Sequence, residues 1–246
     1  MAQSINLIQV IGASLLSILP IALWLGLIMW QDRKKPEPFI WLGLVFVTGI
    51  FLTLPVFLME NGLVQFFSSW SNYSFFNILV FLGIAFIEEL SKFLAVFFLM
   101  KKNKYFDELI DRMIYLVFMA LGFAFIENIA ITYQEMISII GLGSVLKILG
   151  LRFMGANLVH LLCSGLIGFF WALSTVYHQQ KYLFWGIISG IGLHTIFNIV
   201  IMKWGAEFLF AICLALFVFA LFILWAFDIL KHLKFNFKQN KIIKNN

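Results

Sequence analysis

Charged residues and cysteines are both scarce in this chain, and each shortage narrows what the protein can be. Only 12% of its 246 residues are charged, against about 25% in a soluble domain. The two cysteines, Cys163 and Cys213, lie inside apolar runs without a second ligand at a metal-binding spacing. The sequence therefore predicts neither a disulfide nor a cysteine metal site, and each cysteine is expected to be a small buried hydrophobe.

Long polar segments are missing as well. No loop between the apolar runs is long enough to hold a second domain, so residues 1–246 are expected to form one membrane-embedded domain. The net charge is +5, but the basic residues lie at the ends of apolar segments and form no patch. We therefore expect a lipid bilayer around the chain and no nucleic-acid partner.

Apolar residues, in contrast to charged residues and cysteines, are abundant. They make up 63% of the chain, against ~45–50% in a soluble domain. Runs of about 20 apolar residues are long enough to span a bilayer as helices. The predicted fold class is all-α, a polytopic transmembrane helical bundle of about seven spans in a cell membrane, near residues 5–30, 38–59, 74–100, 111–133, 153–177, 182–203 and 207–230.

The distribution of basic residues predicts how the bundle is oriented. Thirteen Lys and Arg residues lie in one set of loops together with the tail 231–246, and three lie in the opposite set. Cytoplasmic loops carry the excess of Lys and Arg. The N-terminus is therefore expected outside and the basic tail in the cytoplasm. Two short apolar stretches, 62–70 and 136–150, are expected to lie on the outer membrane surface.

Ionisable side chains nevertheless occur inside the predicted spans. A charge at the bilayer centre costs ~3 kcal/mol, and this chain accepts that cost on several segments. A rise of ~1.5 Å per residue puts these side chains ~18–22 Å from the cytoplasmic end of their spans. One shared depth predicts a single buried polar site, within a core at about 74–203, built from Glu88, Glu89, Lys92, Glu127, His160 and His194.

Each of these residues also has a structural interpretation. A lone membrane histidine can be a packed, hydrogen-bonded residue, and Glu127 with Asn128 can join two helices. Glu89 and Lys92, three positions apart, can form a structural ion pair. Asn198 alone is equally ambiguous. Their common depth favours a functional site over a set of unrelated structural contacts.

Two hydrolytic schemes fit these residue types. In the first, a glutamate is the general base for a water molecule, while a histidine and Asn198 stabilise the oxyanion. In the second, a zinc ion is held by two histidines and a glutamate, with the remaining glutamate as base. The candidate ligands are His160, His194, Glu127 and Glu88. The chain has no HExxH motif, the most specific zinc signature.

Four motifs in order resemble the PrsW-type intramembrane proteases. Glu88-Glu89-Leu-Ser-Lys92 resembles their EExxK motif, and Gly122-Phe-Ala-Phe-Ile-Glu127-Asn128 resembles their GFxxxEN motif. His160, followed by small residues, is similar to the third motif, and His194-Thr-Ile-Phe-Asn198 to the final HxxxN. Asp111-Arg112 departs from the acidic–glycine pair of the family. The glutamate pair and HxxxN are more distantly similar to the CAAX protease and bacteriocin-processing family.

The resemblance implies an intramembrane endopeptidase whose substrate is a single-pass membrane protein. Family members are linked to the first, outer cut in an anti-sigma factor. PrsW proteins are described as metalloproteases, whereas the CAAX family is thought to use a glutamate-activated water without metal, and the sequence leaves both schemes open.

Residue roles follow as expectations. We expect Glu88 to be the base, because it shares a helix face with Lys92. Glu127 and His160 would orient the water or bind metal, and His194 and Asn198 would stabilise the oxyanion. Glu89, Lys92 and Asn128 would support them.

Two other classes of function remain as alternatives. Carboxylates and histidines in mid-membrane also build the relays of proton- or cation-coupled transporters. The chain shows no internal inverted repeat, which many transporters carry. A protease-like fold could also serve as a non-catalytic immunity or binding protein, although the complete motif set favours an enzyme.

Overall fold

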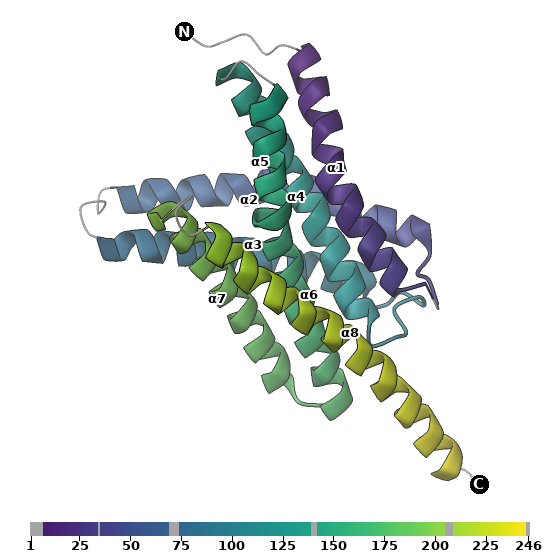
Figure 1. Ribbon diagram of the computed structural model, residues 1–246. Helices are drawn as coiled ribbons and strands as arrows, with labels where there is room; N and C mark the ends of the chain where they lie inside the picture. The colour runs from purple at the N-terminus through teal and green to yellow at the C-terminus, as the bar shows by residue number, and fades with distance from the viewer. Residues whose placement is uncertain (1–6, 34, 69–73, 139–141, 205–208, 245–246) are drawn as a thin grey trace.

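The computed structural model describes residues 7–33, 35–68, 74–138, 142–204 and 209–244, and these residues contain helices but no strand (Figure 1). The predicted all-α class is confirmed. The eight helices of this described part are α1 (Leu7–Gln31), α2 (Phe39–Ser68), α3 (Ser74–Met100), α4 (Asp111–Ser138), α5 (Leu142–Met154), α6 (Ala156–Tyr177), α7 (Gln180–Trp204) and α8 (Leu209–Lys244).

Six helical stretches of the described residues are long and apolar enough to cross a membrane. The chain is therefore a multi-pass membrane protein, as predicted. The remaining expected span, 74–100, is α3, which has spanning length but carries three charged residues in its C-terminal half. The direction of insertion stays a prediction. The six stretches are Ser14–Gln31, Phe39–Ser68, Asp111–Gln134, Val145–Tyr177, Gln180–Lys203 and Ala211–Leu233.

Helix α4 is the centre of the bundle. Every residue from Met113 to Ala124 is buried, and α4 contacts α1, α2, α3, α5 and α6. A helix that is apolar all round has no preferred outer face and is stable where other helices surround it. The other helices are therefore arranged around α4.

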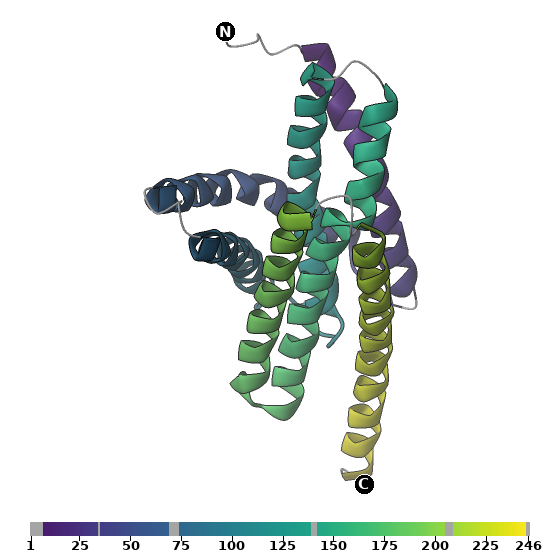
Figure 2. The ribbon, with the colours of Figure 1, turned by 60° about the vertical axis from the view of Figure 1, so that its left-hand side comes forward.

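The α2–α3 hairpin lies across the remaining helices at a steep angle in both views (Figures 1 and 2). Helices α6 and α7 form an antiparallel pair, and α8 packs along α6. Helix α3 contacts α2, α4, α6 and α7. Because of this crossing, the charged half of α3 is covered by protein and not by lipid.

Glycines allow the close crossings around α4. A Cβ atom at Gly49 of α2 would overlap the carbonyl oxygen of Met119, and one at Gly122 of α4 would overlap that of Phe46. Small residues at helix contacts let backbones approach in membrane proteins. The glycine that begins the GFxxxEN motif is thus a packing residue between α2 and α4.

Three expected boundaries differ from the structure. Residues 142–154 form α5, which packs on α1 and α4, whereas a surface-lying segment was expected over 136–150. The helix breaks at Gly155, where the Trp24 indole donates a hydrogen bond of 3.1 Å to the Phe153 carbonyl. Residues 62–68 continue α2, and the basic tail continues α8 to Lys244. Residues 69–70 and 139–141 lie outside the described residues.

Replacement of Gly122 tests the α2–α4 crossing. We expect Gly122→Ala to lower the free energy of unfolding by about 1–3 kcal/mol, the usual cost of overpacking. Thermal unfolding of the purified protein in detergent measures the effect. Gly43→Ala is the matched control on α2, because an added Cβ there meets no atom within 4 Å. Equal stability of the two variants would contradict the packing role.

Candidate active site

The Lys92 ammonium lies at the centre of the predicted polar site. Its Nζ atom is 2.7 Å from Glu89 Oε1, 3.2 Å from Glu88 Oε2 and 2.9 Å from His160 Nδ1. The Lys92 side chain is 0% exposed. Three acceptors satisfy the three hydrogens of an ammonium, so this buried charge is fully paired.

Lys92 also determines the hydrogen bonding of His160. An ammonium only donates, so Nδ1 of His160 is the acceptor in that contact. The other ring nitrogen, Nε2, then carries the hydrogen and donates to Glu127 Oε2 at 3.0 Å. His160 on α6 therefore connects Lys92 of α3 with Glu127 of α4.

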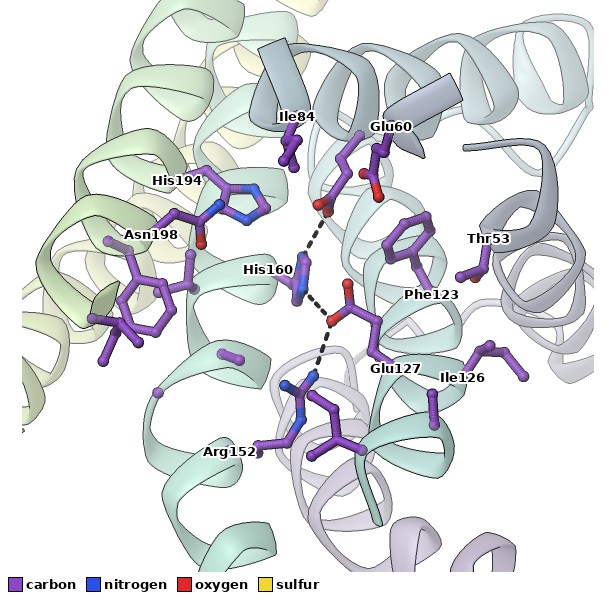
Figure 3. A pocket seen from close by; sticks show the side chains of 18 of the residues that line it. Thr53, Glu60, Ile84, Phe123, Ile126, Glu127, Arg152, His160, His194 and Asn198 are labelled. Carbon is purple, nitrogen blue, oxygen red and sulfur yellow. Dashed lines mark hydrogen bonds and ion pairs between the residues drawn. The ribbon is translucent and has the colours of Figure 1, made fainter. Parts of the chain in front are cut away.

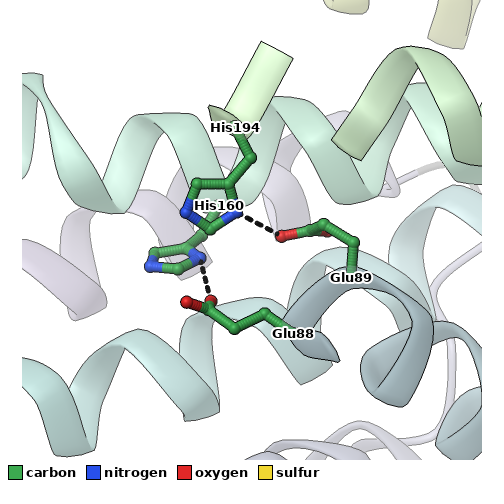
Figure 4. A group of neighbouring side chains, drawn as sticks. All are labelled: Glu88, Glu89, His160 and His194. Atoms are coloured by element: carbon green, nitrogen blue, oxygen red, sulfur yellow. Dashed lines mark hydrogen bonds and ion pairs between the residues drawn. The ribbon is translucent and has the colours of Figure 1, made fainter. Parts of the chain in front are cut away.

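Glu89 orients the second histidine from a fully buried position. Its Oε1 atom is 3.0 Å from His194 Nδ1 (Figure 4), and its Oε2 atom is 3.5 Å from the Ser164 hydroxyl. The rings of His160 and His194 meet edge to face with centroids 5.0 Å apart. With Nδ1 engaged, His194 presents Nε2 to the cavity described next.

A cavity of about 890 Å³ lies beside this network (Figure 3). Its walls are mainly apolar side chains of the helices α2 to α7. The predicted residues divide into two groups: Glu89, Lys92 and Asn128 lie behind the wall, whereas the others line it. The polar lining consists of Thr53, Glu60, Glu88, Glu127, Arg152, His160, His194 and Asn198.

Arg152 belongs to the site although it was expected in an outer loop. Its guanidinium donates to Glu127 Oε2 at 2.9 Å and to the Asn128 side-chain oxygen. Arg152 lies in α5, one turn before the break at Gly155. In the sequence, Arg152 precedes His160 by eight residues, a spacing that puts both on one face of a helix. This spacing was the signal that could have included Arg152 in the predicted site.

Glu60 is a second cavity residue that sequence analysis missed. It lies in α2, and its carboxyl group is within hydrogen-bonding reach of the Glu88 carboxyl. The expected second span ended at residue 59, one residue before Glu60. The structure continues α2 to Ser68 and carries Glu60 into the site.

The donor types in the cluster fit a metal ion. One atom each of Glu88, Glu89, His160 and His194 lies within 4.8 Å of the others, and all four residues are buried. Imidazole and carboxylate groups are the ligands of catalytic zinc. The Lys92 ammonium already contacts three of the four residues, so a bound ion would have to replace some of these contacts.

Comparison with known sequences identifies the family. The model of the PrsW family intramembrane metalloproteases matches residues 37–226. The chain belongs to this family. The match covers all four motifs and the helices α2 to α7 that surround the cavity. The PrsW family is membrane-embedded, in agreement with the spans found here.

Two curated relatives support the PrsW assignment. The chain is 30% identical over 236 residues to Protease PrsW of Clostridioides difficile (strain 630), which covers 94% of each chain. It is 35% identical over 113 residues to Protease PrsW of Oceanobacillus iheyensis, which covers 46% of this chain and 50% of the relative. No solved structure matches the chain significantly. The protein is therefore a membrane protease of the PrsW family.

Removal of the central ammonium tests its structural role. We expect Lys92→Met to lower the free energy of unfolding by about 3–5 kcal/mol, because two buried carboxylates lose their counter-ion. Unfolding of the purified protein in mixed micelles measures the change. Lys181→Met removes an exposed ammonium and is expected to leave stability unchanged. An equally stable Lys92→Met protein would show that the carboxylates need no cation.

Proposed function

We propose that this PrsW-family protein is an endopeptidase that cleaves a single-pass membrane protein with water activated by Glu88. The observation that supports this most is that Glu88 lines an apolar cavity while contacting Lys92 and facing His160. Ligand sites are typically concave, mostly apolar and equipped with a few convergent polar groups. A cavity of about 890 Å³ is large enough for several residues of an unwound substrate.

Glu88 is best placed to be the general base. It reaches the cavity, whereas Glu89 is 0% exposed and holds His194 and Lys92 from behind. The Lys92 ammonium donates to Glu88 Oε2 at 3.2 Å and so orients this carboxyl group at the cavity wall. We therefore assign Glu89 a positioning role.

His194 and Asn198 are the groups we assign to the oxyanion. They are four residues apart on α7, share one helix face and both line the cavity. Protonated His194 would donate from Nε2 to the oxyanion, with the Glu89 carboxylate beside Nδ1 as its counter-charge. Donors held in place before the reaction stabilise a developing negative charge most effectively.

Glu127 and His160 form the opposite side of the cavity. Arg152 and His160 both bind Glu127 Oε2, at 2.9 Å and 3.0 Å. This carboxylate is thus held rigidly and can orient the attacking water or the departing amine. We assign it a positioning role, because its charge is already shared by two donors.

Cleavage of a purified substrate tests the assignment. We expect Glu88→Gln to lower kcat by at least about 10²-fold, since general-base catalysis contributes ~10²–10⁴-fold. The assay follows a single-pass membrane peptide in lipid vesicles, with Asp228→Asn as a control remote from the cavity. Full activity of folded Glu88→Gln would refute the role of Glu88. A wild-type protein without cleavage would favour the non-catalytic alternative, whereas the family match already argues against a transporter.

A zinc-dependent reaction is the second candidate, supported by the donor set and by the description of the family. Glu88, His160 and His194 would hold the ion, which would supply an activated water molecule and a Lewis acid. If zinc is required, we expect a chelator to abolish cleavage and metal analysis to find one zinc per chain. Full activity after metal removal, with metal-free protein confirmed by elemental analysis, would leave the glutamate scheme.

The substrate class remains part of the proposal. The resemblance suggests an anti-sigma factor that is cut on the outer side of the membrane. The depth estimated from the sequence, slightly outside the midplane, is compatible with such a cut. Co-expression of the protein with candidate single-pass anti-sigma factors, compared with the Glu88→Gln variant, would identify the fragment released.

A further inference from the structure

A second group of carboxylates lies away from the cavity, where the loops before α2 and α4 meet. Glu37 precedes α2, Asp107 lies between α3 and α4, and Asp111 is the first residue of α4. One oxygen from each lies within 4.8 Å of the others. None of the three lines the catalytic cavity, and Asp111 is ~24 Å from Glu127 along α4.

Asp111 contains a buried oxygen without a hydrogen-bond donor. The residue is 0% exposed, and its Oδ2 atom accepts from the Glu108 backbone N–H. Its Oδ1 atom has no donor among the described residues. The Glu37 carboxyl lies within hydrogen-bonding reach of Asp111 but offers an acceptor when ionised. Among the described residues, the environment of Asp111 Oδ1 thus contains a neighbouring carboxyl group but no hydrogen-bond donor.

The local charges do not balance. Lys35 binds Asp107 and Glu108 at 3.0 Å and 3.1 Å. Arg112 lies beside Asp111, and Lys231 lies close enough to Asp32 to influence it. These three basic residues face five carboxyl groups, which leaves an excess of two formal negative charges when all five are ionised. The carboxyl groups are Asp32, Glu37, Asp107, Glu108 and Asp111.

We propose that Glu37, Asp107 and Asp111 form a binding site for one hard divalent cation such as Mg²⁺. Carboxylate oxygens are the preferred ligands of such ions. Oxygens bound to one such ion are at most about 4–5 Å apart, and these three lie within 4.8 Å of one another. A single divalent ion also balances the excess charge.

Surrounding groups hold the ligands in place. The Tyr115 hydroxyl donates to Glu37 Oε2 at 2.6 Å, and Asp32 accepts from the Glu37 backbone N–H at 2.9 Å. Burial raises the pKa of Asp32 to about 6, with Glu37 and Glu108 adding to the effect. The two hydrogen bonds hold the Glu37 carboxyl group and its backbone in position at the start of α2.

The ion would connect two loops that precede tightly crossing helices. Glu37 leads directly into α2, and Asp111 begins α4, the pair that crosses at Gly49 and Gly122. Asp107 has a side chain that is 56% exposed and leaves the site open to solvent. The site therefore has an entry for a hydrated ion and two buried ligands to retain it.

Manganese binding tests the proposal with the full-length protein in lipid nanodiscs. Titration with Mn²⁺, followed by the EPR signal of free Mn²⁺, is expected to show one bound ion that Mg²⁺ displaces. Asp107→Asn and Asp111→Asn are expected to weaken binding at least 10-fold. Asp228→Asn, an exposed carboxylate on α8, and His194→Ala, in the catalytic cluster, are expected to retain it.

Three results would overturn the proposal. They are wild-type protein that binds no Mn²⁺, binding that persists in both aspartate variants, and binding that His194→Ala alone removes. If wild-type protein binds no Mn²⁺, a proton shared by Glu37 and Asp111 would take the place of the cation. Asp107 is exposed, so Asp107→Asn is expected to fold. Its Mn²⁺ binding therefore tests the proposal even if Asp111→Asn does not fold. A thermal midpoint that Mg²⁺ raises by ~2 °C or more in wild type but not in Asp107→Asn is the second measurement.

Discussion

The rest of the structure depends on one buried ammonium. Lys92 lies inside the bundle at 0% exposure, where lipid would surround it in an isolated helix. An unpaired charge there is costly, so α3 must bring it against acceptors from its own turn and from α6. Those contacts continue through His160 to α4 and through Glu89 to α7. The pairing of one charge thereby determines how four helices meet.

That requirement explains why the α2–α3 hairpin crosses the other helices (Figure 1). The crossing covers the charged half of α3 with protein, and glycines on α2 and α4 let the backbones approach. The same geometry leaves a cavity between the helices α2 to α7. Structural charges lie behind its wall, and groups that can act on a peptide line it. The buried ion pairs and the polar cavity lining thus come from neighbouring residues of the same motifs.

The fold class and most of the site were predictable because their signals are local. Apolar runs predict spans, and Glu88, Glu127 and the two histidines are conspicuous in lipid. Arg152 and Glu60 were missed for one physical reason. Hydropathy is read from residue types alone, and a polar residue lowers it wherever that residue lies. A polar residue buried among helices therefore looks the same as a polar residue in a loop. Both residues lie next to an expected span boundary, and packing, not composition, carries them inside.

The sequence by itself determined that the chain spans the membrane, that it carries PrsW motifs, and which side chains must find polar partners. Those properties follow from composition and from spacing along single helices. Only the tertiary structure decided that Glu88 faces the cavity while Glu89 does not, and that Glu37 approaches Asp111. Each of these depends on the angle and distance between helices far apart in sequence, which side-chain packing sets.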